Sequence, residues 1–174
     1  MNIPTRLLVM QRLQKLLETT YDVDGRIIDT TGRVTRNRNL TGEEVKDEAL
    51  SILEAPRPDF AAFAGEGEGW RKDNLTILIQ GRVLDDKLQP GDNGYWFAAA
   101  VEQRLCRITE EKSQGREGGM YPEHYMLGGT ITKLEIAPPV VRPPEDKVSA
   151  MAFFFLAVRI GIAVKIGEPY TSVL

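Results

Sequence analysis

The stretch from Asn74 to Ile108 constrains the fold most, because nearly every residue type in it suits a strand, a turn or a helix. Apolar and polar residues alternate from Leu75 to Leu84, as in a strand with one buried face. Two aspartates and the turn Pro90-Gly91-Asp92 follow, and Asp92 is suited to cap a helix over residues 93–110. That helix would bury an apolar stripe formed by Phe97, Ala98, Val101, Leu105 and Ile108.

Other periodic segments predict one more helix and several more strands. Apolar residues at helical spacing predict a helix from Pro4 to Thr20. Strands are expected over residues 33–39, 49–54, 130–136 and 150–166. The first of these strands carries charges that suit a sheet edge. The last is unusually long, which suggests a bend near Phe154 or a projection beyond the domain. Gly81 interrupts an apolar row and suggests a bulge or a close helix crossing.

The order of these elements indicates an α+β fold, with a mostly antiparallel, mixed sheet flanked by two main helices. The chain has 174 residues, of which 42% are hydrophobic and 27% charged, and this suits a single domain. We expect a core over residues 1–166, a poorly packed inserted loop over 109–129 and a flexible C-terminal arm over 167–174. The longest apolar run, Ala150 to Val158, is too short for a membrane helix, and no signal-peptide pattern opens the chain. We therefore expect no membrane partner and synthesis in the cytoplasm.

Few residues offer catalytic chemistry. His124 is the only histidine and Cys106 the only cysteine, so a nucleophile with an imidazole base would have to use His124. We expect His124 in a surface loop and Cys106 as a small buried residue of the helix. These counts exclude a metal site built from a cysteine and histidine cluster. They do not exclude a carboxylate site for Mg²⁺ or Ca²⁺, for which Asp22-Val23-Asp24-Gly25 and Asp85-Asp86 are the candidates, but the first lacks the rest of a calcium loop and the second suits a turn before a helix. The sequence favours no enzyme activity, no cofactor and no bound metal.

Two other classes of protein stay open. Glu44-Val45-Lys46, with an upstream acidic residue such as Asp29, is similar to the carboxylate–X–lysine core of metal-dependent, restriction-type nucleases. A nuclease would show Mg²⁺-dependent cleavage that the substitution Glu44→Ala abolishes. The surrounding residues are very polar for a central strand, which weakens this interpretation. A monomeric binding module would instead use the loop 109–129 as its recognition element.

Arg33, Arg36 and Arg38 form a basic cluster, and Arg36 and Arg38 would point to one side of a strand. Three interpretations are open: contact with DNA phosphates, contact with an acidic partner surface, or a solvated edge strand. The net charge of −3 argues against a dedicated nucleic-acid binder.

Four segments carry a family resemblance. They are Leu13-Gln14-Lys15-Leu16-Leu17, the run Ala49-Leu50-Ser51-Ile52-Leu53-Glu54-Ala55-Pro56, the unit from Leu75-Thr76-Ile77 through Asp85-Asp86 to Ala98-Ala99-Ala100-Val101, and the strand Val158 to Val164 followed by Tyr170. Through their order and pattern the chain resembles the tail terminator (tail completion) proteins of long-tailed bacteriophages, the family of the lambda minor tail protein U. The loops at 57–73 and 109–129 have no counterpart in this resemblance.

The resemblance implies a structural virion protein of the tail or neck with no enzymatic role. It implies a homo-oligomeric ring, commonly a hexamer, that caps the tail tube and stops polymerisation of the tube protein. The ring would also join the head-side connector protein, and DNA would pass through its lumen. The nearest alternative is another neck or head–tail joining protein of the same virion.

A cyclic contact is heterologous, so a ring subunit needs two different side faces. Edge strands, a long final strand and a terminal arm are suitable contacts, because extended segments add to exposed sheet edges. The expected assembly contacts are Arg33, Arg36, Arg38, Arg159, Lys165 and Tyr170. A slightly acidic chain also suits a channel through which DNA must move without being retained.

Overall fold

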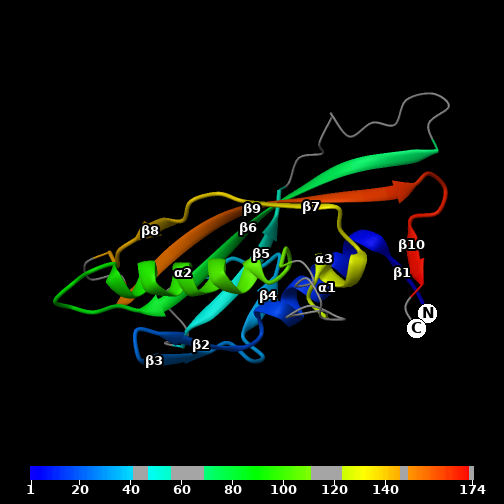
Figure 1. The fold of residues 1–174 in the computed structure, drawn as a ribbon. Helices are drawn as coiled ribbons and strands as arrows, with labels where there is room; N and C mark the ends of the chain where they lie inside the picture. Colours follow the sequence, from blue (N-terminus) through cyan, green and yellow to red (C-terminus); the bar gives the residue numbers. More distant parts are fainter. Residues whose placement is uncertain (41–46, 56–68, 111–122, 146–148, 173–174) are drawn as a thin grey trace.

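A mixed β-sheet forms the frame of the fold (Figure 1). The structure is a computed structural model that describes residues 1–40, 47–55, 69–110, 123–145 and 149–172. Among these residues six strands form the sheet, in the order β4-β5-β6-β9, with β7 and β8 both on the far side of β9. The strands are β4 (Val34–Arg36), β5 (Ala49–Glu54), β6 (Trp70–Leu84), β7 (Lys133–Ile136), β8 (Val140–Arg142) and β9 (Met151–Lys165). Only β4 and β5 pair in parallel within this described sheet.

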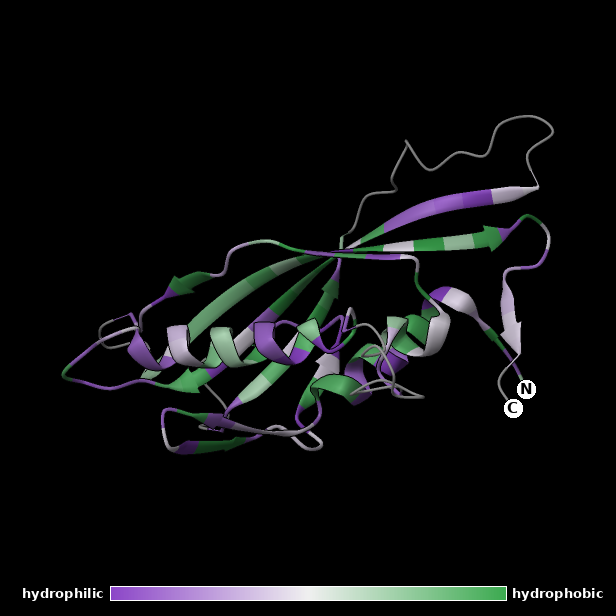
Figure 2. Ribbon diagram, viewed as in Figure 1, coloured by the Kyte–Doolittle hydropathy of each residue, from purple (hydrophilic) through white to green (hydrophobic). Residues whose placement is uncertain are grey.

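The helices α1 (Thr5–Leu17) and α2 (Asp92–Cys106) cover one face of the sheet (Figure 1). α2 packs against β6 and β9, while α1 packs against α2 and β4. The hairpin formed by β2 (Thr20–Val23) and β3 (Arg26–Asp29) packs on α2 through β2. Figure 2 shows apolar residues along the strands beneath the helices. The expected α+β fold, with a mostly antiparallel sheet and two main helices, is confirmed for the described residues.

The start of α2 differs slightly from the expectation. Gly91 is the cap residue, in a left-handed conformation with φ of 96°, and Asp92 is the first helical residue. Both carboxylate oxygens of Asp85 accept the Gly91 N–H at 3.0 Å. Asp92 therefore does not cap the helix, although its charge complements the positive end of the helix dipole. The helix ends at Cys106, before the predicted residue 110, yet every residue of the predicted apolar stripe is fully buried.

The strands β6 and β9 pair in register along their full lengths. β7 reaches β9 only as far as Gly161, so the start of β6 and the end of β9 project as a two-stranded ribbon (Figure 1). The projection suggested by the length of the last strand is thus confirmed. The bulge or helix crossing suggested for Gly81 is wrong, because Gly81 pairs in register with Phe154 and the ring of Phe154 covers it.

The C-terminal segment does not form the free arm that the sequence suggested. β10 (Tyr170–Ser172) pairs antiparallel with β1 (Asn2–Pro4) in a separate two-stranded sheet. The Ser172 hydroxyl lies 2.9 Å from Asn2 Oδ1, and the Thr5 N–H donates to the Pro169 carbonyl oxygen at 2.9 Å. These bonds hold the C-terminal segment against the beginning of α1.

The described part of the loop predicted over 109–129 is anchored to the core. Residues 111–122 lie outside the described part of the chain. α3 (Met126–Gly129) is a tight turn in which Leu127 and Gly128 adopt left-handed backbone angles. Leu127 is buried, and Arg12 of α1 donates to its carbonyl oxygen at 2.7 Å. The expectation of poor packing is therefore wrong for this end of the loop.

Tyr21 gives the fold a measurable dependence on alkaline pH. Its hydroxyl donates to the Leu17 carbonyl oxygen at 2.9 Å in a buried position. Burial raises the pKa of Tyr21 above its ordinary value of 10.0, because the phenolate is poorly solvated there. The stabilisation is therefore complete below pH 10 and is lost as pH rises above it, where only the unfolded state ionises this group.

We expect the free energy of unfolding to fall above pH 10 by up to about 1.4 kcal/mol per pH unit relative to the Tyr21→Phe variant. Urea unfolding of both proteins from pH 8 to 11 measures this difference. Parallel curves over that range would contradict the assignment.

Candidate functional site

A groove lies between α1 and the edge strand β4. Its volume is about 780 Å³. Its lining consists of Pro4, Arg6, Leu7, Met10, Gln14, Val34, Thr35, Arg36, Asn37, Arg38 and Glu54. The structure therefore brings together two of the predicted contact residues, Arg36 and Arg38, beside the first helix.

The groove exposes backbone groups of an edge strand. In the described sheet β4 pairs on one side only, with β5. The Arg33 carbonyl oxygen and the Asn37 N–H bond to β5, so the backbone groups of Val34 and Arg36 face away from it. Gln14 of α1 donates to the Val34 carbonyl oxygen at 2.8 Å. The N–H and C=O groups of Arg36 bond to no described residue, which suits them to pair with an added strand, as in other strand-addition sites.

Basic side chains dominate the groove. Neither Arg36 nor Arg38 makes a side-chain hydrogen bond or ion pair with another described residue. Arg6 is held by Asp73 at 2.7 Å and lies 3.8 Å from Glu54. The hydroxyl of Thr35 is shielded from solvent and has no hydrogen-bond partner among the described residues. The groove therefore suits an extended segment that carries acidic or polar acceptor groups.

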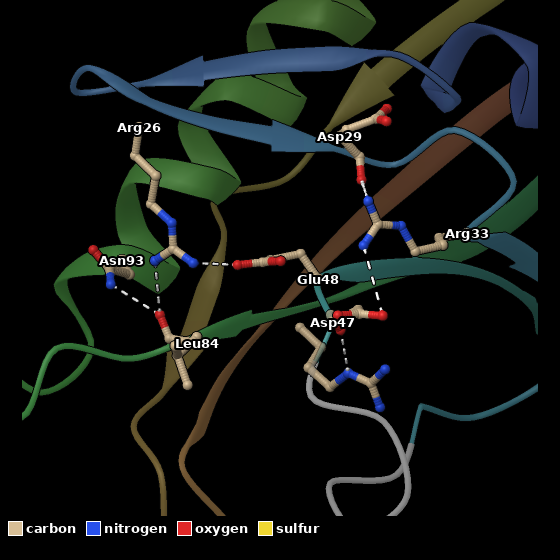
Figure 3. A network of polar contacts seen from close by, with 8 residues as sticks. Arg26, Asp29, Arg33, Asp47, Glu48, Leu84 and Asn93 are labelled. Atoms are coloured by element: carbon tan, nitrogen blue, oxygen red, sulfur yellow. Dashed lines mark hydrogen bonds and ion pairs between the residues drawn. The ribbon is translucent and has the colours of Figure 1, made fainter.

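Arg33 does not belong to the groove, although the sequence placed it with Arg36 and Arg38. It donates to the carbonyl oxygen of Asp29 and lies 4.0 Å from the carboxylate of Asp47 (Figure 3). It thereby links the end of the β2–β3 hairpin to the segment before β5. Its role in these contacts is to stabilise the fold.

The same network continues to the start of α2. Arg26 pairs with Glu48 and donates to the Leu84 carbonyl oxygen at 3.1 Å. Asn93 donates to that same oxygen at 2.9 Å (Figure 3). These bonds fix the end of β6 against the hairpin and the first turn of α2.

The other predicted contacts are spread along the ribbon and the terminal strands. Arg159 lies on the outer face of β9, 3.6 Å from Glu135. Lys165 is at the end of β9 and pairs with Glu168 at 2.5 Å. Tyr170 is exposed on β10. The structure leaves these side chains accessible but does not gather them into one site with the groove.

The residues considered for catalysis are also scattered. Cys106 is exposed, so its predicted burial is wrong. His124 is half-buried in the turn before α3, 3.3 Å from Glu123. The backbone N–H of Thr31 bonds to Asp29 and lowers the pKa of that carboxyl, as in an ordinary turn. Glu44 and Lys46 lie outside the described residues.

Sequence reasoning missed several exposed apolar side chains at the two ends of β6. Trp70 and Ile166 are 58% and 55% exposed at the ribbon. Leu88, Tyr95 and Trp96 are 86%, 60% and 50% exposed around the start of α2. Tyr95 and Trp96 fall outside the buried stripe of the helix, which was a signal that could have identified them. Adjacent aromatic residues off a core stripe are typical of contact surfaces.

No family model matches this chain, and a search of curated proteins finds no match either. The helices that the structure describes include none with the length and apolar character needed to cross a bilayer. Within the same residues no three histidine, cysteine or acidic side chains gather where they could share a metal ion.

Proposed function

We propose that the chain is a ring-forming tail terminator of a long-tailed bacteriophage. The observation that carries the proposal is the groove between α1 and β4, where an edge strand of the described sheet lies beside Arg36 and Arg38, two arginines with no ion pair to a described residue. A surface of this kind binds another polypeptide by strand addition, which is the chemistry that an assembly protein needs. The resemblance of the helix and strand motifs to tail terminator proteins suggests that this assembly is the tail of a long-tailed bacteriophage.

In this proposal the groove receives an extended segment of the tail tube protein at the end of the finished tube. Backbone hydrogen bonds to β4 would supply affinity, and Arg36 and Arg38 would select acidic or polar residues of that segment. The occupied tube end then offers no site for another tube subunit, so polymerisation stops. The opposite side of the ring would meet the head-side connector, and DNA would pass through the lumen.

The experiment is a capping assay with tubes assembled from purified tube protein. We expect the chain to bind one end of each tube, to form a ring there, and to arrest elongation when more tube protein is added. Electron microscopy measures both the cap and the tube length. Uncapped tubes that keep growing, together with virions of normal tail length made without this protein, would overturn the proposal.

The same assay distinguishes a tail terminator from a head–tail joining protein and from a monomeric binding module. A head–tail joining protein would leave tail length unchanged when it is removed, and finished tails would fail to attach to heads. A monomeric binding module would neither cap tubes nor alter attachment. Each outcome is visible in micrographs of particles produced with and without the protein.

A further inference from the structure

The two ends of β6 carry surfaces of different chemistry. The strand has 15 residues and at about 3.4 Å per residue spans roughly 50 Å. Figure 1 shows its first residues in the projecting ribbon and its last residues beside the start of α2, at opposite ends of the molecule. Side chains at these two ends cannot meet within one copy of the chain.

The projecting end, here named the basic tip, consists of Trp70, Arg71, Lys72, Lys165, Ile166 and Glu168. Trp70 and Ile166 expose more than half of their surface, so the tip has an apolar centre. Among the described residues of the tip, Lys72 and Lys165 lie on the same face of the ribbon as Trp70, Arg71 lies on the other face, and Glu168 supplies the one exposed carboxylate. The Ile166 N–H donates to the Gly69 carbonyl oxygen at 2.9 Å, which fixes the ribbon end before any partner arrives.

The opposite end, here named the acidic end, consists of Asp86, Lys87, Leu88, Asp92, Tyr95 and Trp96. Its three large apolar side chains are at least half exposed. Asp86 and Asp92 are exposed carboxylates, and the half-buried Asp85 lies behind them at Gly91. Asp86 also accepts the Leu88 N–H at 2.8 Å, so this loop too is ordered in the free chain.

We propose that the basic tip of one copy docks on the acidic end of the next copy. The occupant is a second copy of this chain, because the described residues of the two ends carry opposite net charge and each end exposes large apolar side chains that the other can cover. Such a contact is heterologous, which is the type that closes into a ring. Exposed tryptophans with a charged rim are typical of interface centres, and preordered loops lower the entropic cost of docking. The inference rests on the proposed function, since it names the subunit contact of that ring.

The chain carries its own probes for this contact. Trp70 and Trp96 are its two tryptophans, one at each proposed surface. In a Trp70→Phe variant the emission of Trp96 should shift to shorter wavelength on self-association. In a Trp96→Phe variant the emission of Trp70 should shift in the same direction.

Trp96→Ala should weaken association about 30-fold, as expected for a residue at an interface centre. Association that leaves both emission spectra unchanged would overturn the inference.

Charge reversal gives the decisive test. Variant one carries Asp86→Lys and Asp92→Lys, and variant two carries Arg71→Glu and Lys72→Glu. In each variant alone, like charges would meet at every contact. We therefore expect each variant to sediment as a monomer in analytical ultracentrifugation and to form no ring on tube ends. An equimolar mixture should assemble again, because every contact can then join opposite charges. The control Lys15→Glu changes an exposed residue of α1 and should assemble like the unmodified chain.

The outcomes distinguish this inference from the function on which it rests. Assembly of each reversed variant alone, at the affinity of the unmodified chain, would overturn the subunit contact and leave tube capping intact. Monomers that persist in the mixture would overturn it as well, provided that thermal unfolding shows both variants folded. Failure of the unmodified chain to cap tubes would instead overturn the proposed function.

Discussion

Replacing Gly81 by alanine should cost about 3 kcal/mol of stability, at the upper end of the range for overpacked cores. A β-carbon at this position would lie 1.9 Å from Cε1 and 2.2 Å from Cζ of Phe154. The ring of Phe154 is fully buried and contacts Phe97 edge-on at a centroid distance of 5.3 Å, so it has no free space into which to turn. We expect the melting temperature to fall by roughly 6–12 °C, which calorimetry measures.

A double-mutant cycle checks this cause. Phe154→Leu removes the ring atoms that would collide with the new methyl group. The Gly81→Ala/Phe154→Leu protein should therefore be more stable than the sum of the single changes predicts, by at least about 1 kcal/mol. Gly69→Ala is the matched control, because a β-carbon there meets no atom within 4 Å. Strict additivity of the two single effects would show that the collision is not the cause.

Reversing Arg36 and Arg38 together to glutamate should lower the affinity for tube ends by about 100-fold, or roughly 2.7 kcal/mol. Both side chains line the groove without a described ion pair, so their reversal places two negative charges where an acidic or polar segment is expected to dock. The free energy of unfolding should change by no more than about 0.5 kcal/mol. Capping assays and urea unfolding of the same preparation measure both quantities.

Arg33→Glu is the informative counterpart of that variant. Arg33 contacts Asp29 and Asp47 rather than the groove, so its reversal should destabilise the fold by about 1 kcal/mol and leave capping unchanged. If Arg33→Glu lowers the affinity for tube ends as much as the double reversal of Arg36 and Arg38 does, the groove is not the contact. Tails of normal length made with the doubly reversed protein would lead to the same conclusion.

Long periodic segments made most of the fold predictable. The alternation after Leu75 fixed both the existence of β6 and its buried face, and the stripe from Phe97 to Ile108 identified the buried side of α2. Each of these patterns samples several turns or pleats, so one atypical residue does not hide it. Ala49–Glu54 was recognised with its observed bounds because Pro56 and Pro58 end the segment.

Short elements and long-range contacts were not predictable in this way. β1 and β10 have three residues each and stabilise one another only because the two ends of the chain meet. The role of Gly81 depends on a ring supplied by Phe154, which lies far along the sequence. Cys106 sits beside a buried leucine but on the solvent side of the last helical turn. Local sequence contains no information on such neighbours.

The candidate site was predictable in part. The charges of residues 33–39 correctly suggested an edge strand, and the structure adds the groove that α1 forms beside it. The predicted alternation of Arg36 and Arg38 along that strand is wrong, because β4 ends at Arg36 and Asn37 has a left-handed φ of 54°. Arg33 could not be separated from them by spacing alone, because its partners come from β3 and from the segment before β5. The exposed Trp70 and Trp96 needed the full fold before their positions at opposite ends of β6 became visible.

The pairing of β1 with β10 has a consequence for engineering. Asn2 and Ser172 are joined by a side-chain contact of 2.9 Å, so a short peptide linker could connect β10 to β1 without distorting either strand. A circularly permuted protein, opened at an exposed turn such as Asp24-Gly25, would then retain every core contact. Labels attached next to Asn2 or next to Ser172 would report from the same corner of the molecule.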